Sequence, residues 1–221
     1  MGAICLVRHG QASFGAADYD VLSETGERQA RVVGEELRRR GVTVAHAVSG
    51  TLSRQVATAV TPLAGFAPDA TLRRDARWNE YDFADVAAAH GDGDPAQNAL
   101  DPRAYQALLD AALAEWVRAG EHGGAKETWP AFVARVTSAL DDLVAGLRKG
   151  EQAVVFTSGG VIATVCGLLT GDAARGLLGL NRVAVNTGIT KIVTGRSGTT
   201  LLSFNEHGHI DAAASGLLSY R

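Results

Sequence analysis

Cysteine is scarce in this chain of 221 residues. The two cysteines, Cys5 and Cys166, stand inside apolar runs, where a thiol behaves as a small hydrophobic side chain. We therefore expect no disulfide framework. Basic residues are not in excess either, because 21 of them face 24 acidic residues and give a formal net charge of -3. Without a basic surface the chain lacks the electrostatic footprint of a nucleic-acid-binding protein, so we expect no nucleic-acid partner.

Long apolar runs are also missing. No stretch reaches the roughly 20 apolar residues that cross a bilayer, so we expect no membrane partner. The first residues, MGAICLVRHG, lack the charged start and the long apolar region of a signal peptide. These absences predict a cytoplasmic location. Because 46% of the residues are hydrophobic, the chain can bury a sizeable core, and its length favours a single domain over residues 1–221.

Short apolar stretches of strand length alternate with helical patterns. Three stretches are nearly apolar throughout, as in strands that are covered on both faces: residues 3–7, 44–48 and 153–157. Amphipathic helices are expected at about 24–40 and 129–147, with Ser23 and Thr128 as their caps. Residues 187–204 are typical of two strands around a Gly-Arg-Ser-Gly turn. The pattern predicts a three-layer α/β/α fold with a mostly parallel, mixed sheet.

The first strand, within ICLVRHGQ, runs directly into Arg8, His9 and Gly10. Ligands of open α/β sheets bind beyond the carboxyl ends of the strands, where these residues would lie. The second strand is followed by SGTLSRQVATA, which places Arg54 in the first turn of a helix. Two guanidinium groups and a helix N-terminus form an anion site that suits phosphate. A neutral imidazole among such groups is a candidate nucleophile that would form a phosphohistidine.

Five motifs occur along the chain in the order LVRHGQ, LSETGERQA, SGTLSRQVATA, WNEYDF and VNTGITKI. Together they resemble the histidine phosphatase superfamily, also called phosphoglycerate-mutase-like, over essentially the whole chain. The resemblance implies that His9 accepts the phosphoryl group, that Arg8 and Arg54 hold the phosphate, and that Glu80 of WNEYDF is the proton donor. Asp82 and Asp85 are close enough in sequence to remain alternatives for the acid.

One position departs from the family pattern. The family has a second histidine, usually in a Ser-His-Gly-Gly context after a buried strand. Here Ser158, Gly159 and Gly160 follow the strand at 153–157, and Ser158 stands in the place of the histidine. By resemblance we expect Ser158 and the backbone of Gly159 to bind the phosphate. A hydroxyl group supplies a neutral donor where an imidazolium supplies a charged one, which predicts reduced activity.

Residues 75–128 differ in composition from the rest of the chain. They include Trp78, Trp116 and the loop-like runs HGDGDPAQN and AGEHGGAK. This composition predicts a helical insertion over the active site, with a flexible segment near 90–102.

The leading hypothesis is a phosphatase that acts on a small phosphorylated substrate without a cofactor or a metal ion. A phosphoglycerate-mutase-type phosphoryl transfer is an alternative, although the Trp-Asn pair that usually follows the signature in family mutases is absent. A weakly active or non-catalytic phospholigand-binding module is a second alternative, which Ser158 favours. Ser158 as a serine nucleophile fits poorly, because Phe156 stands where the nucleophile elbow needs glycine. The oligomeric state, including a homodimer, stays open.

Overall fold

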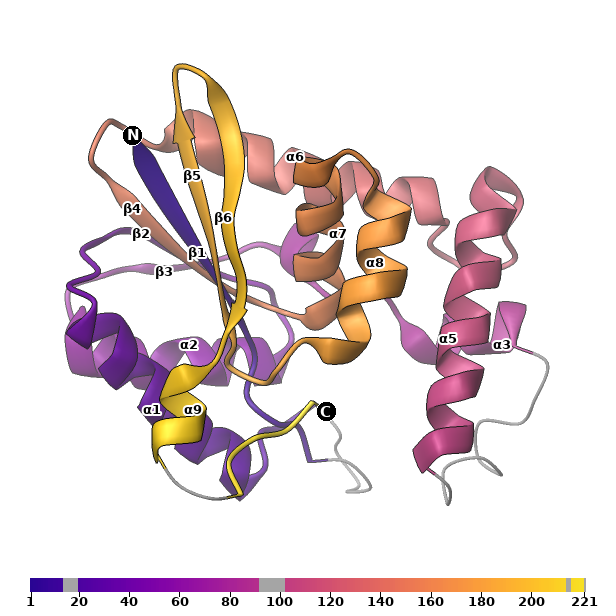
Figure 1. Cartoon of the computed structure of the whole chain (residues 1–221), viewed down its shortest axis with the longest axis horizontal. Helices are drawn as coiled ribbons and strands as arrows, with labels where there is room; N and C mark the ends of the chain where they lie inside the picture. The colour runs from indigo at the N-terminus through magenta and orange to yellow at the C-terminus, as the bar shows by residue number, and fades with distance from the viewer. Residues whose placement is uncertain (14–19, 92–101, 214–215, 221) are drawn as a thin grey trace.

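The computed structural model describes residues 1–13, 20–91, 102–213 and 216–220. Within these residues six strands form one sheet in the order β3-β2-β4-β1-β5-β6 (Figure 1). The strands are β1 (Gly2–Arg8), β2 (Val44–Ser49), β3 (Leu72–Arg74), β4 (Gln152–Thr157), β5 (Ile189–Gly195) and β6 (Gly198–Glu206). The first four strands are mutually parallel, whereas β5 runs antiparallel to both of its neighbours. The prediction of a mostly parallel, mixed sheet is confirmed, and the short edge strand β3 is an addition to it.

Helices cover both faces of the sheet. The α-helices are α1 (Glu24–Arg39), α2 (Ser53–Phe66), α3 (Phe83–His90), α5 (Pro102–Ala119), α6 (Trp129–Gly146), α7 (Gly159–Thr170), α8 (Ala173–Leu180) and α9 (Gly208–Ala213). Single 3₁₀ turns are η1 (Ala76–Trp78), η2 (Gly120–His122) and η3 (Asn181–Val183). In Figure 1, α1, α2 and α9 lie on one side of the sheet, and α6, α7 and α8 lie on the other. None of the described helices combines the length and the apolar character needed to span a membrane.

The alternating side chains of β1 show why the fold has three layers. Cys5 and Val7 are buried in one cluster with side chains of α1 and α2. Ile4 and Leu6 point to the opposite face and are buried in a second cluster with side chains of α6 and α7. Successive side chains of a strand point to opposite faces, so an almost wholly apolar strand needs cover on both. Cys166 is also buried and free, so both thiols belong to the core.

The helix ends follow from local sequence chemistry. The Ser23 hydroxyl accepts a hydrogen bond from the Gly26 amide at 3.1 Å, and the Thr128 hydroxyl accepts one from the Ala131 amide at 3.4 Å. Each bond satisfies an N–H group that has no partner within its helix. Gly41, with a φ of 65°, follows α1 in the left-handed region that favours glycine. The caps predicted for α1 and α6 are thereby confirmed.

The region between β3 and α6 contains η1, α3, α5 and η2. Figure 1 shows α3 and α5 beside one another, outside the layer formed by α7 and α8. The helical content expected for residues 75–128 is confirmed, while their standing as an insertion stays a prediction. Of the segment near 90–102 that was predicted to be flexible, residues 92–101 lie outside the described residues.

Glycine allows α8 to pack closely on α7. A Cβ atom at Gly176 would lie 2.5 Å from the Ala163 carbonyl oxygen and 2.5 Å from the Gly167 Cα atom. We expect Gly176→Ala to force the helices apart and to lower the free energy of unfolding by about 1–3 kcal/mol in urea titrations. Gly179→Ala is the matched control, because a Cβ at this exposed position of α8 would meet nothing within 4 Å. Equal effects of the two substitutions would contradict this account of the packing.

Candidate active site

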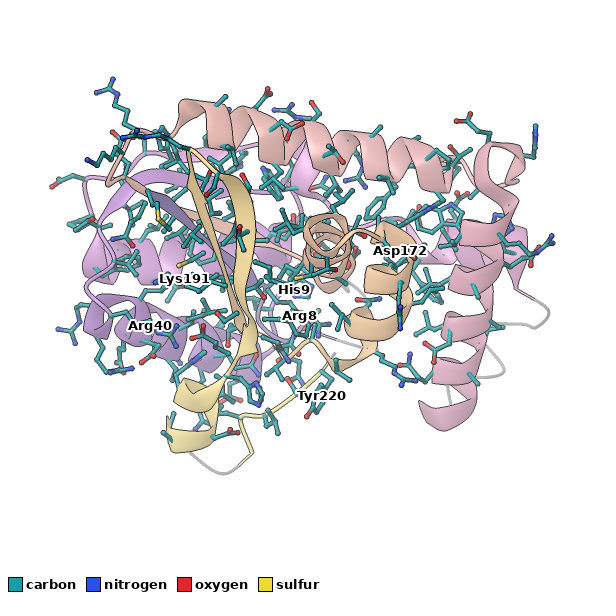
Figure 2. All side chains as sticks on the ribbon, turned by 45° about the horizontal axis from the view of Figure 1, so that its top comes forward. Arg8, His9, Arg40, Asp172, Lys191 and Tyr220 are labelled. Atoms are coloured by element: carbon teal, nitrogen blue, oxygen red, sulfur yellow. The ribbon has the colours of Figure 1, made fainter. Side chains whose placement is uncertain are left out.

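The strand register brings predicted site residues together at the carboxyl ends of the parallel strands. In the parallel ladder of β1 and β4, Arg8 lies opposite Thr157, and β2 ends at Ser49 next to β4. The residues that follow these strands therefore leave the sheet on the same side, as expected for a ligand site of an open α/β fold. His9 directly follows the carboxyl end of β1 (Figure 2).

Hydrogen bonds hold the backbone of His9 on both sides. Its N–H group donates to the Thr157 carbonyl at 2.8 Å, and the Asn186 side-chain amide donates to the His9 carbonyl at 3.0 Å. The next residue, Gly10, lies against the first turn of α1. A Cβ atom there would be 2.6 Å from the Gly26 carbonyl oxygen, so only glycine permits this approach. The turn after β1 is consequently rigid, and it places the imidazole in a fixed position.

The hydrogen bonds of the His9 ring define its tautomer. Nδ1 lies 2.7 Å from the Gly10 carbonyl oxygen, which can only accept, so Nδ1 carries the proton. The Arg54 Nε–H group donates to Nε2 at 3.2 Å, so Nε2 presents a lone pair. Burial, together with the positive charges of Arg54 and Arg8, lowers the pKa of His9 well below its usual value. The imidazole is thus neutral at pH 7, with its lone pair on Nε2.

Two guanidinium groups flank the imidazole. Arg54 is nearly buried, and its Nη1 atom lies 2.6 Å from a carboxylate oxygen of Asp20. Arg8 donates through Nη1 to the carbonyl oxygens of Ala184 and Tyr220, the latter at 2.8 Å. The C-terminal residues therefore reach back to the site, and Figure 2 shows Tyr220 close to Arg8. The arrangement has the positive charge and the planar donors of an anion site.

The carboxyl group of Glu80 faces the start of α7. One carboxylate oxygen accepts from the Gly160 amide at 2.9 Å, and the other accepts from the Tyr81 amide at 3.3 Å. Burial raises the pKa of Glu80, although the Gly160 N–H group and the charges of Arg54 and Arg8 act in the opposite direction. A carboxyl group with a raised pKa retains its proton at a higher pH than an exposed one, as a general acid requires.

The neighbouring carboxylates have other partners. Asp82 caps α3 by accepting from the Asp85 amide at 3.1 Å. Asp85 accepts from the Lys126 amide at 2.6 Å, and the Lys126 ammonium lies 3.6 Å from it. Both carboxylates therefore hold local structure. Of the three candidates, Glu80 is the one whose surroundings suit an acid.

Comparison with known proteins places the chain in a family. The sequence profile of the histidine phosphatase superfamily (branch 1) matches residues 4–207. The chain belongs to the histidine phosphatase superfamily. A search of curated proteins found no match to the chain.

Solved structures with this fold include phosphatases and a mutase. A phosphoserine phosphatase from Entamoeba histolytica is 18% identical with a TM-score of 0.67, and the match covers 95% of this chain and 100% of that one. A mycobacterial glucosyl-3-phosphoglycerate phosphatase complexed with VO3 is 25% identical with a TM-score of 0.67, covering 93% and 99%. A phosphoglycerate mutase from Bacillus anthracis is 23% identical with a TM-score of 0.66, covering 94% of each chain.

Ser158 stands immediately before α7 in this member of the superfamily. Its side chain has no exposed surface, and its hydroxyl accepts from the Gln55 side-chain amide at 2.8 Å. Gln55 is also fully buried and donates to the Trp78 carbonyl at 3.1 Å. A role of Ser158 in binding phosphate stays a prediction, since the described contact of its hydroxyl is with a protein amide.

The absence of a side chain at Gly159 lets two polar groups approach the first turn of α7. A Cβ atom at Gly159 would lie 2.7 Å from the Asn181 side-chain oxygen and 3.4 Å from Arg8 Nε. Asn181 in turn donates to the Tyr81 hydroxyl at 3.1 Å. Gly159 therefore lies beside the Arg8 guanidinium, and its role in binding phosphate stays a prediction.

Sequence reasoning missed several residues that hold the site. Asn186 lies in the quoted motif VNTGITKI and Gln55 follows Arg54 directly, so the motifs themselves marked both positions. Thr58, whose hydroxyl accepts from the Gly10 amide at 2.9 Å, lies in the same motif as Arg54. No local sequence pattern indicated the hydrogen bond between Arg8 and the Tyr220 carbonyl.

Gln55 fills the space beside Ser158, and a substitution can test whether it limits the size of the side chain at this position. Ser158→His adds a ring where the Gln55 amide nitrogen already lies 2.8 Å from the hydroxyl oxygen. We expect overpacking to lower the free energy of unfolding by about 1–3 kcal/mol in urea titrations. The loss should shrink in a Gln55→Ala background, where room exists for the imidazole. Equal losses in both backgrounds would show that Gln55 does not limit this position.

Proposed function

We propose that this histidine phosphatase superfamily member is a phosphatase that hydrolyses a small phosphomonoester through a phosphohistidine on His9. The observation that carries the proposal is the His9 ring, which is neutral, protonated on Nδ1 and flanked by the Arg8 and Arg54 guanidinium groups. A nucleophile toward phosphorus needs a lone pair and nearby positive charge that offsets the charge of the phosphoryl oxygens. This ring has both.

In the first step, the Nε2 lone pair of His9 forms a bond to phosphorus while the bond from phosphorus to the ester oxygen breaks. Arg8 and Arg54 bind the phosphoryl oxygens, for which Arg54 turns from Asp20 and Nε2 toward the substrate. Glu80 gives its proton to the leaving oxygen, which departs as an alcohol. The products of this step are the free alcohol and a phosphohistidine.

In the second step, water attacks the phosphohistidine. The Glu80 carboxylate, which lost its proton in the first step, takes one from the water as the new oxygen–phosphorus bond forms. The nitrogen–phosphorus bond breaks, and the electron pair returns to Nε2. Inorganic phosphate leaves, and both side chains regain their starting protonation states.

The names of similar structures support this class of reaction. Two of those described above are phosphatases, for phosphoserine and for glucosyl-3-phosphoglycerate, and one of these was solved with VO3. The shared element of these substrates is a phosphate ester on a small polar molecule. We propose the same broad substrate class for this chain, bound as a single phosphate between Arg8 and Arg54.

A panel of phosphate esters tests the proposal. We expect hydrolysis of a generic aryl phosphate and of small alkyl phosphates, and loss of at least about 10³-fold of this activity in His9→Ala, because a nucleophile's removal leaves only the remaining site groups. 3-Phosphoglycerate, with and without bisphosphate, tests for a mutase in the same panel.

Each other result of the panel has a defined meaning. Isomerisation of 3-phosphoglycerate without net release of phosphate would replace the phosphatase by a mutase. Binding of phosphate without turnover of any ester would replace it by a binding module. Full activity of a folded His9→Ala protein would contradict the mechanism.

The acid role of Glu80 predicts a dependence on leaving group and on pH. Glu80→Gln should slow hydrolysis of an alkyl phosphate by about 10²–10⁴-fold and of an activated aryl phosphate far less, because a good leaving group needs little protonation. In the unsubstituted protein, the alkyl phosphate rate should fall as the pH rises through the raised pKa of Glu80, where the acid loses its proton. It should fall on the acidic side only below the lowered pKa of His9, where the nucleophile gains a proton.

The pH profile of Glu80→Gln serves as the control for this assignment. Its basic limb should be missing, since glutamine does not titrate, while its acidic limb should remain. An unchanged basic limb, or equal losses on both esters, would move the acid role away from Glu80.

A further inference from the structure

Residues 77–82, which include Glu80, form a segment that we call the acid segment. This segment is held through its backbone carbonyl groups. Arg135 of α6 donates through Nη1 to the Arg77 carbonyl at 3.0 Å and to the Asn79 carbonyl at 2.7 Å. Its Nη2 atom lies 3.5 Å from the carbonyl oxygen of Glu80 itself. One guanidinium group thus contacts three carbonyls within four residues, including that of the proposed acid.

Arg135 is itself fixed in place. Its guanidinium forms a two-point contact with the Glu127 carboxylate, at 2.5 Å from Nε and 2.9 Å from Nη2. The same group lies over the Phe132 ring, 4.6 Å from its centroid. Both members of the ion pair are largely shielded from solvent, with side-chain exposures of 20% for Arg135 and 31% for Glu127. A guanidinium held in a planar, two-point geometry loses little further freedom when it binds carbonyl groups.

Uncharged groups hold the same segment from the sheet side. The Trp78 carbonyl accepts from the Thr157 hydroxyl at 2.6 Å and from the Gln55 amide at 3.1 Å. The Asn79 side chain donates to the Thr51 hydroxyl at 2.7 Å. The segment is therefore clamped between the strand ends and α6, and among these contacts Arg135 supplies the charged donor.

We propose that Arg135, held by Glu127, is a positioning residue that sets the place of the Glu80 carboxyl group relative to the leaving oxygen. The proposal rests on the proposed function, in which Glu80 is the acid. A general acid must lie within hydrogen-bond reach of the atom that it protonates. A displacement of about 1 Å can cost on the order of 10² in rate. Within the described residues, the hydrogen bonds of the guanidinium go to the backbone of the acid segment and to Glu127, and none goes to Arg8, His9 or Arg54, so it acts through Glu80.

Arg135→Ala is the primary variant. We expect it to lower kcat for an alkyl phosphate by about 10- to 100-fold with little change in KM, and to lower kcat for an activated aryl phosphate by less than about threefold. Arg135→Lys keeps the charge but not the planar fork, so it should show much of the same selective loss. Glu127→Gln, which frees the guanidinium, should show a smaller loss of the same kind.

Arg118→Ala is the matched control. Arg118 of α5 also pairs with a glutamate, Glu115, but it is exposed and contacts no part of the acid segment in the described structure. Its substitution should leave both rates unchanged. Unfolding curves of all variants separate a local effect on the site from a general loss of stability.

A double-mutant cycle tests whether the effect of Arg135 on the rate depends on Glu80. In a Glu80→Gln background, Arg135→Ala should cause no further selective loss on the alkyl phosphate, because the acid is already absent. Equal losses on both esters, or a full selective loss in the Glu80→Gln background, would overturn the positioning role.

Amide exchange of residues 77–82 gives a readout that needs no enzyme activity. Exchange should accelerate in Arg135→Ala and stay unchanged in Arg118→Ala. If the unsubstituted protein hydrolyses no ester, the proposed function falls and exchange alone decides whether Arg135 holds the segment. Unchanged exchange in Arg135→Ala would overturn the inference, whatever the outcome for activity.

Discussion

The parallel register of β1, β4 and β2 is the constraint on which the site depends. It brings the end of β1 at Arg8 next to the end of β4 at Thr157, so that His9, Ser158 and the helix bearing Arg54 leave the sheet together. The register is set by the apolar side chains of these strands, which pack against helices on both faces. A slip of one residue would exchange the two faces of each strand and separate these groups. Core packing and site geometry are therefore fixed by the same pairing.

At this site, burial and nearby charges shift the pKa values of His9 and Glu80 in opposite directions. His9 is buried between guanidinium groups, which favours its neutral form, whereas Glu80 is shielded beside α7, which favours its protonated form. These shifts have the directions that an unprotonated nucleophile and a protonated acid require. The same guanidinium groups are suited to bind a phosphate, so one arrangement of charge supports both binding and chemistry.

The sequence predicts those features that depend on local pattern. The caps at Ser23 and Thr128, the buried strands and the convergence of His9 with Arg54 follow from residue type, periodicity and the rule for strand ends. Contacts between distant positions leave no such pattern. Gln55 and Ser158 are 103 residues apart, and Arg8 and Tyr220 are 212 apart. In the sequence, Arg135 is one polar residue of an amphipathic helix, and its hydrogen bonds to the Arg77 and Asn79 carbonyls are visible only once α6 packs beside that segment.

The proposed mechanism requires His9 to carry the phosphoryl group from the substrate to water. The direct measurement is rapid denaturation of the protein during turnover of an ester with a labelled phosphate, followed by mapping of the bound label. A phosphohistidine on His9 predicts a label that is labile in acid and stable in base, located on the peptide that contains His9 and absent from His9→Ala. Turnover without any protein-bound label, or an acid-stable label on the peptide that contains Ser158, would contradict it.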